Sequence, residues 1–168
     1  MSAYYRNPGQ RLPAYERGVP IGSVIHFGPF KIGAAHSPAQ TLPSPVGIFS
    51  GELGLTGVDV QGARVTLTWQ AIKVPSVDYT VFVHELDGEG RVVAQNDSPP
   101  NEGGYPTHFW EDGEVVEDPH LLTGDPAAAT QIEIGLYAYP SLTRQPVVDP
   151  RGRPIGDHVL LPICGTAC

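Results

Sequence analysis

Several short segments of the chain alternate between hydrophobic and polar residues. In residues 64–71 every second residue is hydrophobic, and the expected buried face carries Val65, Leu67, Trp69 and Ala71. Successive side chains of a strand point to opposite faces of its sheet, so this period of two predicts a strand with one buried face. We therefore expect Trp69 to be a core residue rather than part of a binding site.

A turn rich in aspartate and glycine joins two further segments of this kind. Residues 78–86 alternate, the chain then reads Asp-Gly-Glu-Gly at 87–90, and a strand-like pattern resumes at 91–97. Asp-Gly is a favoured hairpin turn because glycine adopts positive φ without steric cost. These residues are predicted to form a β-hairpin.

Four more segments predict strands. Glycines interrupt residues 47–60, which indicates a bulged or bent strand, and residues 113–122 predict a short strand that Pro119 interrupts. Residues 130–139 alternate cleanly, and residues 146–163 predict two short strands around a turn.

The pattern as a whole predicts an all-β fold. No segment has a sustained helical period, and the one helix-compatible patch, residues 126–129, is too short to form a helix alone. Roughly seven to nine short strands, with turns rich in glycine and proline, predict an antiparallel β-sandwich that is Ig-like or jelly-roll-like. A partly open barrel is the alternative architecture. We expect an extended N-terminal arm at residues 1–23, the sandwich at 24–163 and a C-terminal tail at 164–168.

The charge balance argues against two classes of partner. The 168 residues include 10 Lys and Arg and 18 Asp and Glu, a formal net charge of −8. Nucleic acids and anionic lipid surfaces both attract basic proteins, so neither is an expected partner. The chain has no apolar run of about 18–20 residues, so we expect no transmembrane segment and no direct membrane insertion. Its start also lacks the apolar segment of a secretory signal, which leaves a cytoplasmic protein or a domain of a larger membrane-targeted protein.

Both cysteines, Cys164 and Cys168, lie in the last five residues. Two thiols do not complete a four-ligand zinc site, and a disulfide between them closes too small a loop to stabilise the fold much. Free thiols are the main expectation, and a disulfide, metal binding or lipid attachment are the alternatives.

Residues 65–163 carry an ordered set of positions that spans the predicted strands and turns: Trp69, Ala71, residues 79–84, Asp87, Gly90, Ala94, Gln95, Asp97, Pro106, Thr107, Trp110, Gly113, Glu114, Asp118, Gly135, Leu136, Tyr137, Gly152, Pro154, Gly156 and Asp157. In this order they resemble the C-terminal extracytoplasmic β-sandwich domain of bacterial, Chloroflexi-type, glycosyltransferase-like membrane proteins. Residues 127–131 depart from the usual pattern. The resemblance implies a sandwich fold and an extracytoplasmic or cell-surface location, and it implies no chemistry for the domain itself.

Residues 105–112 are the segment richest in candidate binding groups. The candidate ligand-binding residues are Tyr105, His108, Phe109, Trp110, Glu111 and Asp112. Aromatic rings stack on the C–H face of a sugar while carboxylates and imidazole bind its hydroxyl groups, so one hypothesis is carbohydrate or peptide binding. That hypothesis requires at least two exposed, coplanar rings. The alternative is that Trp110 closes one end of the sandwich.

Two groups of residues are candidate metal ligands, with calcium as the best candidate ion. They are the pair His84 and Glu85 and the acidic run at 111–120. Neither has zinc-protease or EF-hand spacing, and the pair is predicted to point to opposite faces of a strand. We therefore expect no metal site and interpret the acidic run as a solvated edge that discourages aggregation.

The chain has no motif typical of an enzyme. A nucleophile elbow, a P-loop and a dinucleotide-binding motif are all missing, Ser50 and Ser98 have no signature around them, and Glu111 and Glu114 share one short loop. We expect a non-catalytic accessory or interaction module that contacts a partner protein in a membrane-associated or surface assembly. A carbohydrate-binding module that uses residues 105–112 is the alternative, and a small hydrolase is a weaker one.

Overall fold

The computed structural model describes residues 14–16, 19–22 and 43–163, and the chain divides into two compact units, residues 1–33 and 34–168. In the first unit β1 (Ala14–Glu16) and β2 (Val19–Gly22) form an antiparallel pair. The sequence pattern predicted no strands there. Residues 23–42 and the tail with both cysteines lie outside the described residues.

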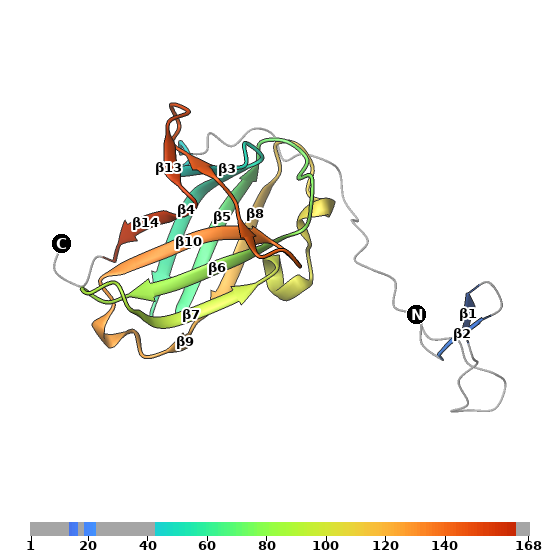
Figure 1. The fold of residues 1–168 in the computed structure, drawn as a ribbon, viewed down its shortest axis with the longest axis horizontal. Coiled ribbons are helices and arrows are strands. Elements are labelled where there is room, and N and C mark those ends of the chain that lie inside the picture. Colours follow the sequence, from blue (N-terminus) through green and yellow to red (C-terminus); the bar gives the residue numbers. More distant parts are fainter. Residues whose placement is uncertain (1–13, 17–18, 23–42, 164–168) are drawn as a thin grey trace. The chain divides into compact units, whose positions relative to one another are not determined.

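The second unit is an antiparallel β-sandwich, as predicted, and Figure 1 shows its two sheets one behind the other. One sheet, which we call the β5 sheet, has the order β13 (Pro154–Gly156), β12 (Val147–Val148), β3 (Gly47–Phe49), β4 (Leu53–Gln61), β5 (Arg64–Ala71) and β8 (Val115–Leu121). The other, the β6 sheet, has the order β11 (Thr143–Arg144), β10 (Gln131–Ala138), β6 (Tyr79–Leu86), β7 (Val92–Ser98) and β9 (Thr123–Gly124), and β14 (Val159–Pro162) also pairs with β10.

The core lies between the inward faces of the two sheets, and the period of two decides which residues fill it. Every second residue of β5 is buried, including Leu67 and Trp69, which confirms the predicted buried face. In β6 the inward row begins with Tyr79, Val81 and Val83. Side chains from both rows join one hydrophobic cluster, so burial of these faces holds the sheets together.

The predicted hairpin of β6 and β7 is confirmed, and an aspartate organises its turn. Asp87 accepts hydrogen bonds from the backbone N–H groups of Glu89 and Arg91 and from Nε of Arg91. These bonds to Arg91 lower the pKa of Asp87. Gly90 has a φ of 78°, which a residue with a side chain rarely adopts. Asp149 makes the same three bonds in the turn between β12 and β13.

The described sandwich has twelve strands, more than the predicted number, because several strands have only two or three residues. Residues 47–60 form two strands, β3 and β4, joined by a turn in which Ser50 and Gly51 have positive φ. The predicted bulge follows at Leu55–Gly57. The closing segment forms β12, β13 and β14 rather than two strands.

Strand β8 runs through Pro119 without the predicted interruption. It is the last strand of its sheet and pairs on one side only, with β5. A residue without an N–H is tolerated at such an edge, where the nitrogen faces away from the partner strand. Pro119 also blocks a further strand from adding there, so it protects the edge.

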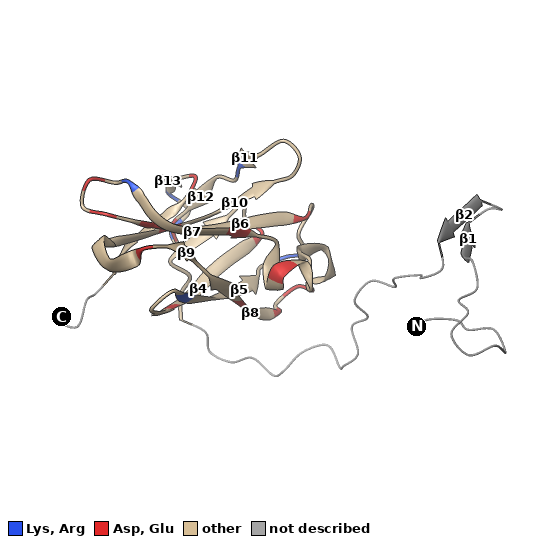
Figure 2. Cartoon of the chain, turned by 90° about the horizontal axis from the view of Figure 1, so that it is seen from below, with Lys and Arg blue, Asp and Glu red and all other residues tan. Residues whose placement is uncertain are grey.

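Short 3₁₀ helices make the remaining regular structure: η1 (Pro100–Gly103), η2 (Thr107–Phe109) and η3 (Pro126–Ala128). No helix in the described part of the chain is long and apolar enough to cross a lipid bilayer. Residues 43–163 contain 17 Asp and Glu and 6 Lys and Arg, and Figure 2 shows the acidic positions spread over strands and loops. The sandwich is therefore strongly acidic.

Candidate functional site

The aromatic loop that was predicted to bind a ligand is folded into the end of the sandwich. The Trp110 side chain is 1% exposed, and its indole N–H donates to the carbonyl oxygen of Tyr105 at 3.1 Å. Phe109 lies against the ring of His108, with centroids 4.0 Å apart. A buried indole cannot stack on a sugar, so Trp110 is not one of the two exposed rings that carbohydrate binding at this loop requires. The geometry favours the alternative in which Trp110 closes the sandwich.

Glu114 shapes the same loop from within. One of its carboxylate oxygens accepts a hydrogen bond from the Tyr105 hydroxyl at 2.7 Å, and the other accepts one from the backbone N–H of Glu111 at 2.8 Å. Glu111 and Glu114 therefore belong to one turn and do not face each other across a cleft, as acid–base catalysis of glycoside hydrolysis requires. Asp112 is exposed in this turn.

His108, the remaining predicted residue, fixes an acidic side chain at the start of β6. Its Nδ1 lies 2.7 and 2.8 Å from the carboxylate oxygens of Asp78. Beside it, the buried hydroxyl of Thr107 accepts from the Tyr79 backbone N–H and donates to the Val77 carbonyl. Burial alone raises the pKa of Asp78, but the hydrogen bonds from His108 outweigh it and lower that pKa overall. Asp78 is therefore an ionised carboxylate at neutral pH, with His108 as its hydrogen-bond partner.

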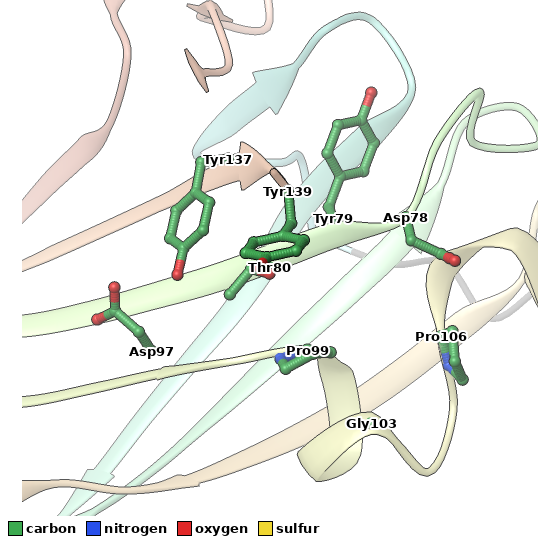
Figure 3. Close-up of a pocket in the computed structure, with 9 residues that line it drawn as sticks. All are labelled: Asp78, Tyr79, Thr80, Asp97, Pro99, Gly103, Pro106, Tyr137 and Tyr139. Carbon is green, nitrogen blue, oxygen red and sulfur yellow. The ribbon is translucent and has the colours of Figure 1, made fainter. Parts of the chain in front are cut away.

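An open groove lies next to the pair of Asp78 and His108, on the outer face of the β6 sheet, with a volume of about 690 Å³ (Figure 3). The groove is lined by the start of β6, the end of β7, the η1 segment and the end of β10. The residues that matter most for its chemistry are Asp78, Thr80, Asp97, Pro99, Tyr137 and Tyr139. Its volume lies within the range of about 300–1,000 Å³ that is typical of ligand pockets.

Aromatic and acidic groups face each other in this groove. Tyr139 is 78% exposed, and the Tyr137 hydroxyl points toward Asp97 (Figure 3). Burial, and then the negative charge of Asp97, raise the pKa of Tyr137. Tyr137 therefore keeps its proton at neutral pH and remains a hydrogen-bond donor beside a carboxylate.

Charged side chains continue from the groove across the outer face of the sheet. Nε2 of His84 lies 3.0 Å from Oδ1 of Asp97, and Nδ1 lies 2.9 Å from Oε2 of Glu133. The guanidinium of Arg144 donates to the other oxygen of Glu133 at 3.0 Å and lies 4.3 Å from the centroid of the Phe82 ring. Burial alone raises the pKa of Glu133, but His84 and Arg144 lower it overall. Both carboxylates are therefore held in place by partners.

Gly135 leaves space for the Phe82 ring on the outer face of the β6 sheet. It lies opposite Phe82 in the β6–β10 pairing, and a Cβ at this position would overlap the Phe82 ring. The missing side chain leaves a hollow in which Phe82 lies flat, almost fully buried although it faces outward. Tyr137 stacks beside it, with ring centroids 6.4 Å apart and an interplanar angle of 19°. The outer face thus carries a row of two stacked rings next to carboxylates.

A second polar cluster, inside the sandwich, was missed by the sequence analysis. Nε2 of His120 lies 2.9 Å from Asp118, and Nδ1 lies 2.8 Å from the amide oxygen of Asn96 and 3.5 Å from the hydroxyl of Ser98. Asp118 also accepts from the backbone N–H of Asn101 at 2.8 Å. These bonds tie β7, β8 and η1 together at the edge of the sandwich. The alternation of residues in β8 could have predicted this cluster, since Asp118 and His120 fall on the same face of the strand as buried Val116.

A carboxylate, a histidine and a serine in this order have the arrangement of a catalytic triad, but the carboxylate and the imidazole are buried. The side chains of Asp118 and His120 are 0% exposed. A triad acts only where its serine meets a substrate and donors stabilise the oxyanion, and both need an accessible cleft. Here the three residues stabilise the fold.

The candidate metal ligands are not gathered around a common point. His84 faces outward and Glu85 inward, as predicted, and Asp118 and His120 turn into the core away from the exposed residues of the acidic run. Within residues 43–163, no group of three or more His, Cys, Asp or Glu side chains is placed to hold a metal ion.

No protein-family model, no curated protein and no solved structure matches this chain. Sequence reasoning identified His108, which holds one groove residue, but not Asp78, Asp97, Tyr137 or Tyr139. A polar or aromatic residue on the outward face of each predicted strand was the only signal for them.

Proposed function

We propose that this chain is a non-catalytic interaction module that binds a partner protein in the groove at the end of the β6 sheet. One observation supports this proposal most directly. The accessible aromatic and acidic groups converge on the groove, whereas Asp118 and His120 of the triad-like cluster are buried. A concave site with exposed rings and a few fixed polar groups is typical of recognition surfaces.

Two neighbouring residues of β7 illustrate why binding is favoured over catalysis. Asp97 faces outward and lines the groove, while Ser98 faces the interior and bonds to Asn96. Since adjacent side chains of a strand point to opposite faces, the serine and its histidine cannot reach a ligand in the groove without breaking the sheet. Asp97 itself is bound to His84.

The resemblance to extracytoplasmic sandwich domains is part of the proposal. Several residues of the shared pattern serve the fold in this chain: Trp69 and Trp110 are buried, Asp87 organises a turn, and Gly135 accommodates Phe82. This supports a common architecture. On the strength of the resemblance we propose an accessory role on the outer side of a bacterial membrane, in association with a membrane protein or surface assembly.

Carbohydrate binding is the second candidate, in the groove rather than at residues 105–112. The exposed ring of Tyr139 and the carboxylate of Asp97, which both line the groove, favour it, because a sugar stacks its C–H face on such a ring and donates hydroxyl hydrogen bonds to a carboxylate. Asp78 supplies a second carboxylate to the same groove.

Photo-crosslinking in cells tests the proposal. A photoreactive phenylalanine analogue at position 139 places the crosslinker in the groove, and the same analogue at exposed Leu121 on β8 is the matched control. We expect a defined crosslinked protein from position 139 that is not formed from position 121. Equal crosslinking from both positions would contradict the assignment of the groove.

Hydrolysis assays with ester and glycoside substrates test the non-catalytic part. We expect no turnover above background. Turnover that Ser98→Ala abolishes, while the circular-dichroism spectrum stays that of the wild type, would show that the chain is an enzyme after all.

A further inference from the structure

We infer that the groove recognises a positively charged side chain, arginine or lysine, from an extended segment of the partner protein. This inference rests on the proposed function and names the chemistry of the partner. The cationic group lies against the rings of Tyr137 and Tyr139 and pairs with Asp97, while the flanking backbone lies along the prolines of the groove.

The charge of the groove is the first argument. Asp78 and Asp97 line it, and none of its lining residues is Lys or Arg. Residues 43–163 as a whole have nearly three times as many acidic as basic residues. A groove with one sign of charge raises the local concentration of ligands with the opposite sign, so a cationic ligand is favoured over a neutral or acidic one.

The same face of the sheet already contains the proposed arrangement once. Arg144 lies over the Phe82 ring and pairs with Glu133, so a guanidinium, an aromatic ring and a carboxylate meet. Such cation–π contacts are attractive because the face of the ring is electron-rich. Tyr137 stacks on Phe82 and lies beside Asp97. The groove therefore has a ring next to a carboxylate, as Phe82 and Glu133 provide for Arg144. In the described part of the chain, Asp97 has a recorded ion pair with His84 and none with Lys or Arg.

The acidic groups are fixed before a ligand arrives. His84, braced by Glu133 at 2.9 Å, holds one oxygen of Asp97, and His108 holds Asp78. Groups held in this way lose little conformational entropy on binding. The side chain of Asp97 is still 37% exposed, so it is accessible to a ligand as well as to His84.

The shape of the groove suits an extended peptide. Its volume of about 690 Å³ is larger than one arginine side chain fills, so neighbouring residues fit as well. Pro99 and Pro106 give it apolar walls, and aromatic and proline-lined grooves bind extended, proline-containing segments because these are already ordered. We therefore expect the recognised segment to be extended and to carry its cation between small or proline residues.

The test is an NMR titration of the ¹⁵N-labelled full chain with two peptides. One is acetyl-Gly-Pro-Arg-Pro-Gly-amide, and the other carries citrulline in place of arginine, which keeps the shape of the side chain but removes its charge. We expect the arginine peptide to shift amide resonances of residues 78–80, 97–106 and 137–139. The citrulline peptide is expected to bind about tenfold more weakly, because a hydrogen-bonded charge contributes about that factor or more.

Substitutions locate the cation. Asp97→Asn is expected to weaken binding of the arginine peptide about tenfold, and Tyr139→Ala about threefold, as a lost charge-assisted bond and a lost exposed cation–π contact would do. Asp59→Asn, which removes an exposed carboxylate from β4 of the other sheet, is the matched control and is expected to change nothing. Tyr139→Ala changes a side chain on the surface, so it tests the inference even if Asp97→Asn perturbs the sheet. Raising NaCl from about 25 to 300 mM is expected to weaken binding several-fold.

Cellohexaose, a neutral oligosaccharide, separates the inference from the proposed function. Equal affinity for the arginine and citrulline peptides, or groove shifts with cellohexaose alone, would overturn the cationic partner and retain the groove as a binding surface. Peptide-induced shifts centred outside the groove, or no shifts with any probe, would count against both.

Discussion

Glu85 is a carboxyl group in the core, and replacing it is expected to stabilise the protein. It continues the inward row of Tyr79, Val81 and Val83 on β6 and is 1% exposed. No described residue is within hydrogen-bond reach of its Oε2. Leaving a buried polar atom without a partner costs about 1–3 kcal/mol, so Glu85→Met should raise the free energy of unfolding by about that amount. For a chain of this length, each kcal/mol shifts Tm by about 2–4 °C.

The gain in the free energy of unfolding from Glu85→Met should depend on pH. Burial raises the pKa of Glu85 in the folded state above its ordinary value. Between about pH 4, the ordinary value for a glutamate in the unfolded chain, and the raised folded value, the folded state holds a proton that the unfolded state has lost. In that window the Glu85 contribution to stability falls as pH rises, by at most about 1.4 kcal/mol per pH unit. Glu85→Gln cannot ionise, so it should remove this slope.

The assay is urea unfolding of the wild type and both variants at several pH values between 4 and 8, followed by tryptophan fluorescence. Comparison with the wild type at each pH cancels the contributions of other carboxylates, such as Asp78 and Glu133, whose pKa values are lowered. Glu117→Gln, which changes an exposed carboxyl on β8, is the control and should leave the pH dependence unchanged. A Glu85→Met protein that is less stable than the wild type at pH 8, or an unaltered slope in Glu85→Gln, would refute the reasoning.

Three further substitutions test the packing and the polar clusters. Gly135→Ala should lower the free energy of unfolding by about 1–3 kcal/mol, because its methyl group displaces the Phe82 ring. Chemical denaturation measures this change, and an unchanged free energy of unfolding would contradict the overlap. Asp118→Asn should lower the free energy of unfolding by about 1–3 kcal/mol, since it weakens the buried hydrogen bonds of this carboxylate to His120 and to the Asn101 backbone, and Glu117→Gln on the exposed face of β8 again serves as control in the same assay. Gly90→Ala should lower Tm by a few degrees, because φ of 78° strains any residue with a side chain by about 1 kcal/mol; an unchanged Tm would mean that the turn rearranges freely.

Hydrophobic alternation was enough to predict the architecture, because a strand exposes its two faces in turn whatever lies around it. Trp69 and its neighbours on β5 lie where the pattern placed them, and the Asp-Gly turn after β6 is confirmed. Local rules failed where the position of a strand in its sheet decided the outcome. Pro119 continues a strand because β8 is at an edge, and that edge position is not encoded near residue 119.

The binding groove depends on contacts between residues far apart in the chain. Asp78, Asp97 and Tyr139 come from three segments that meet only after β6 pairs with both β7 and β10. The sequence drew attention to residues 105–112 because aromatic and acidic residues are adjacent there, but burial of Trp110 removed its ring from the surface.

The amino-acid sequence by itself determined that the chain is acidic and all-β. The hydrophobic period of two also predicts most of the residues that face the core. The tertiary structure decided which polar groups stay in water, which lie sealed as in the pair of Asp118 and His120, and which converge on one groove. The reason is that burial and proximity depend on how the strands are ordered and how the sheets pack. That order is settled by the free energy of the whole core rather than by any one segment.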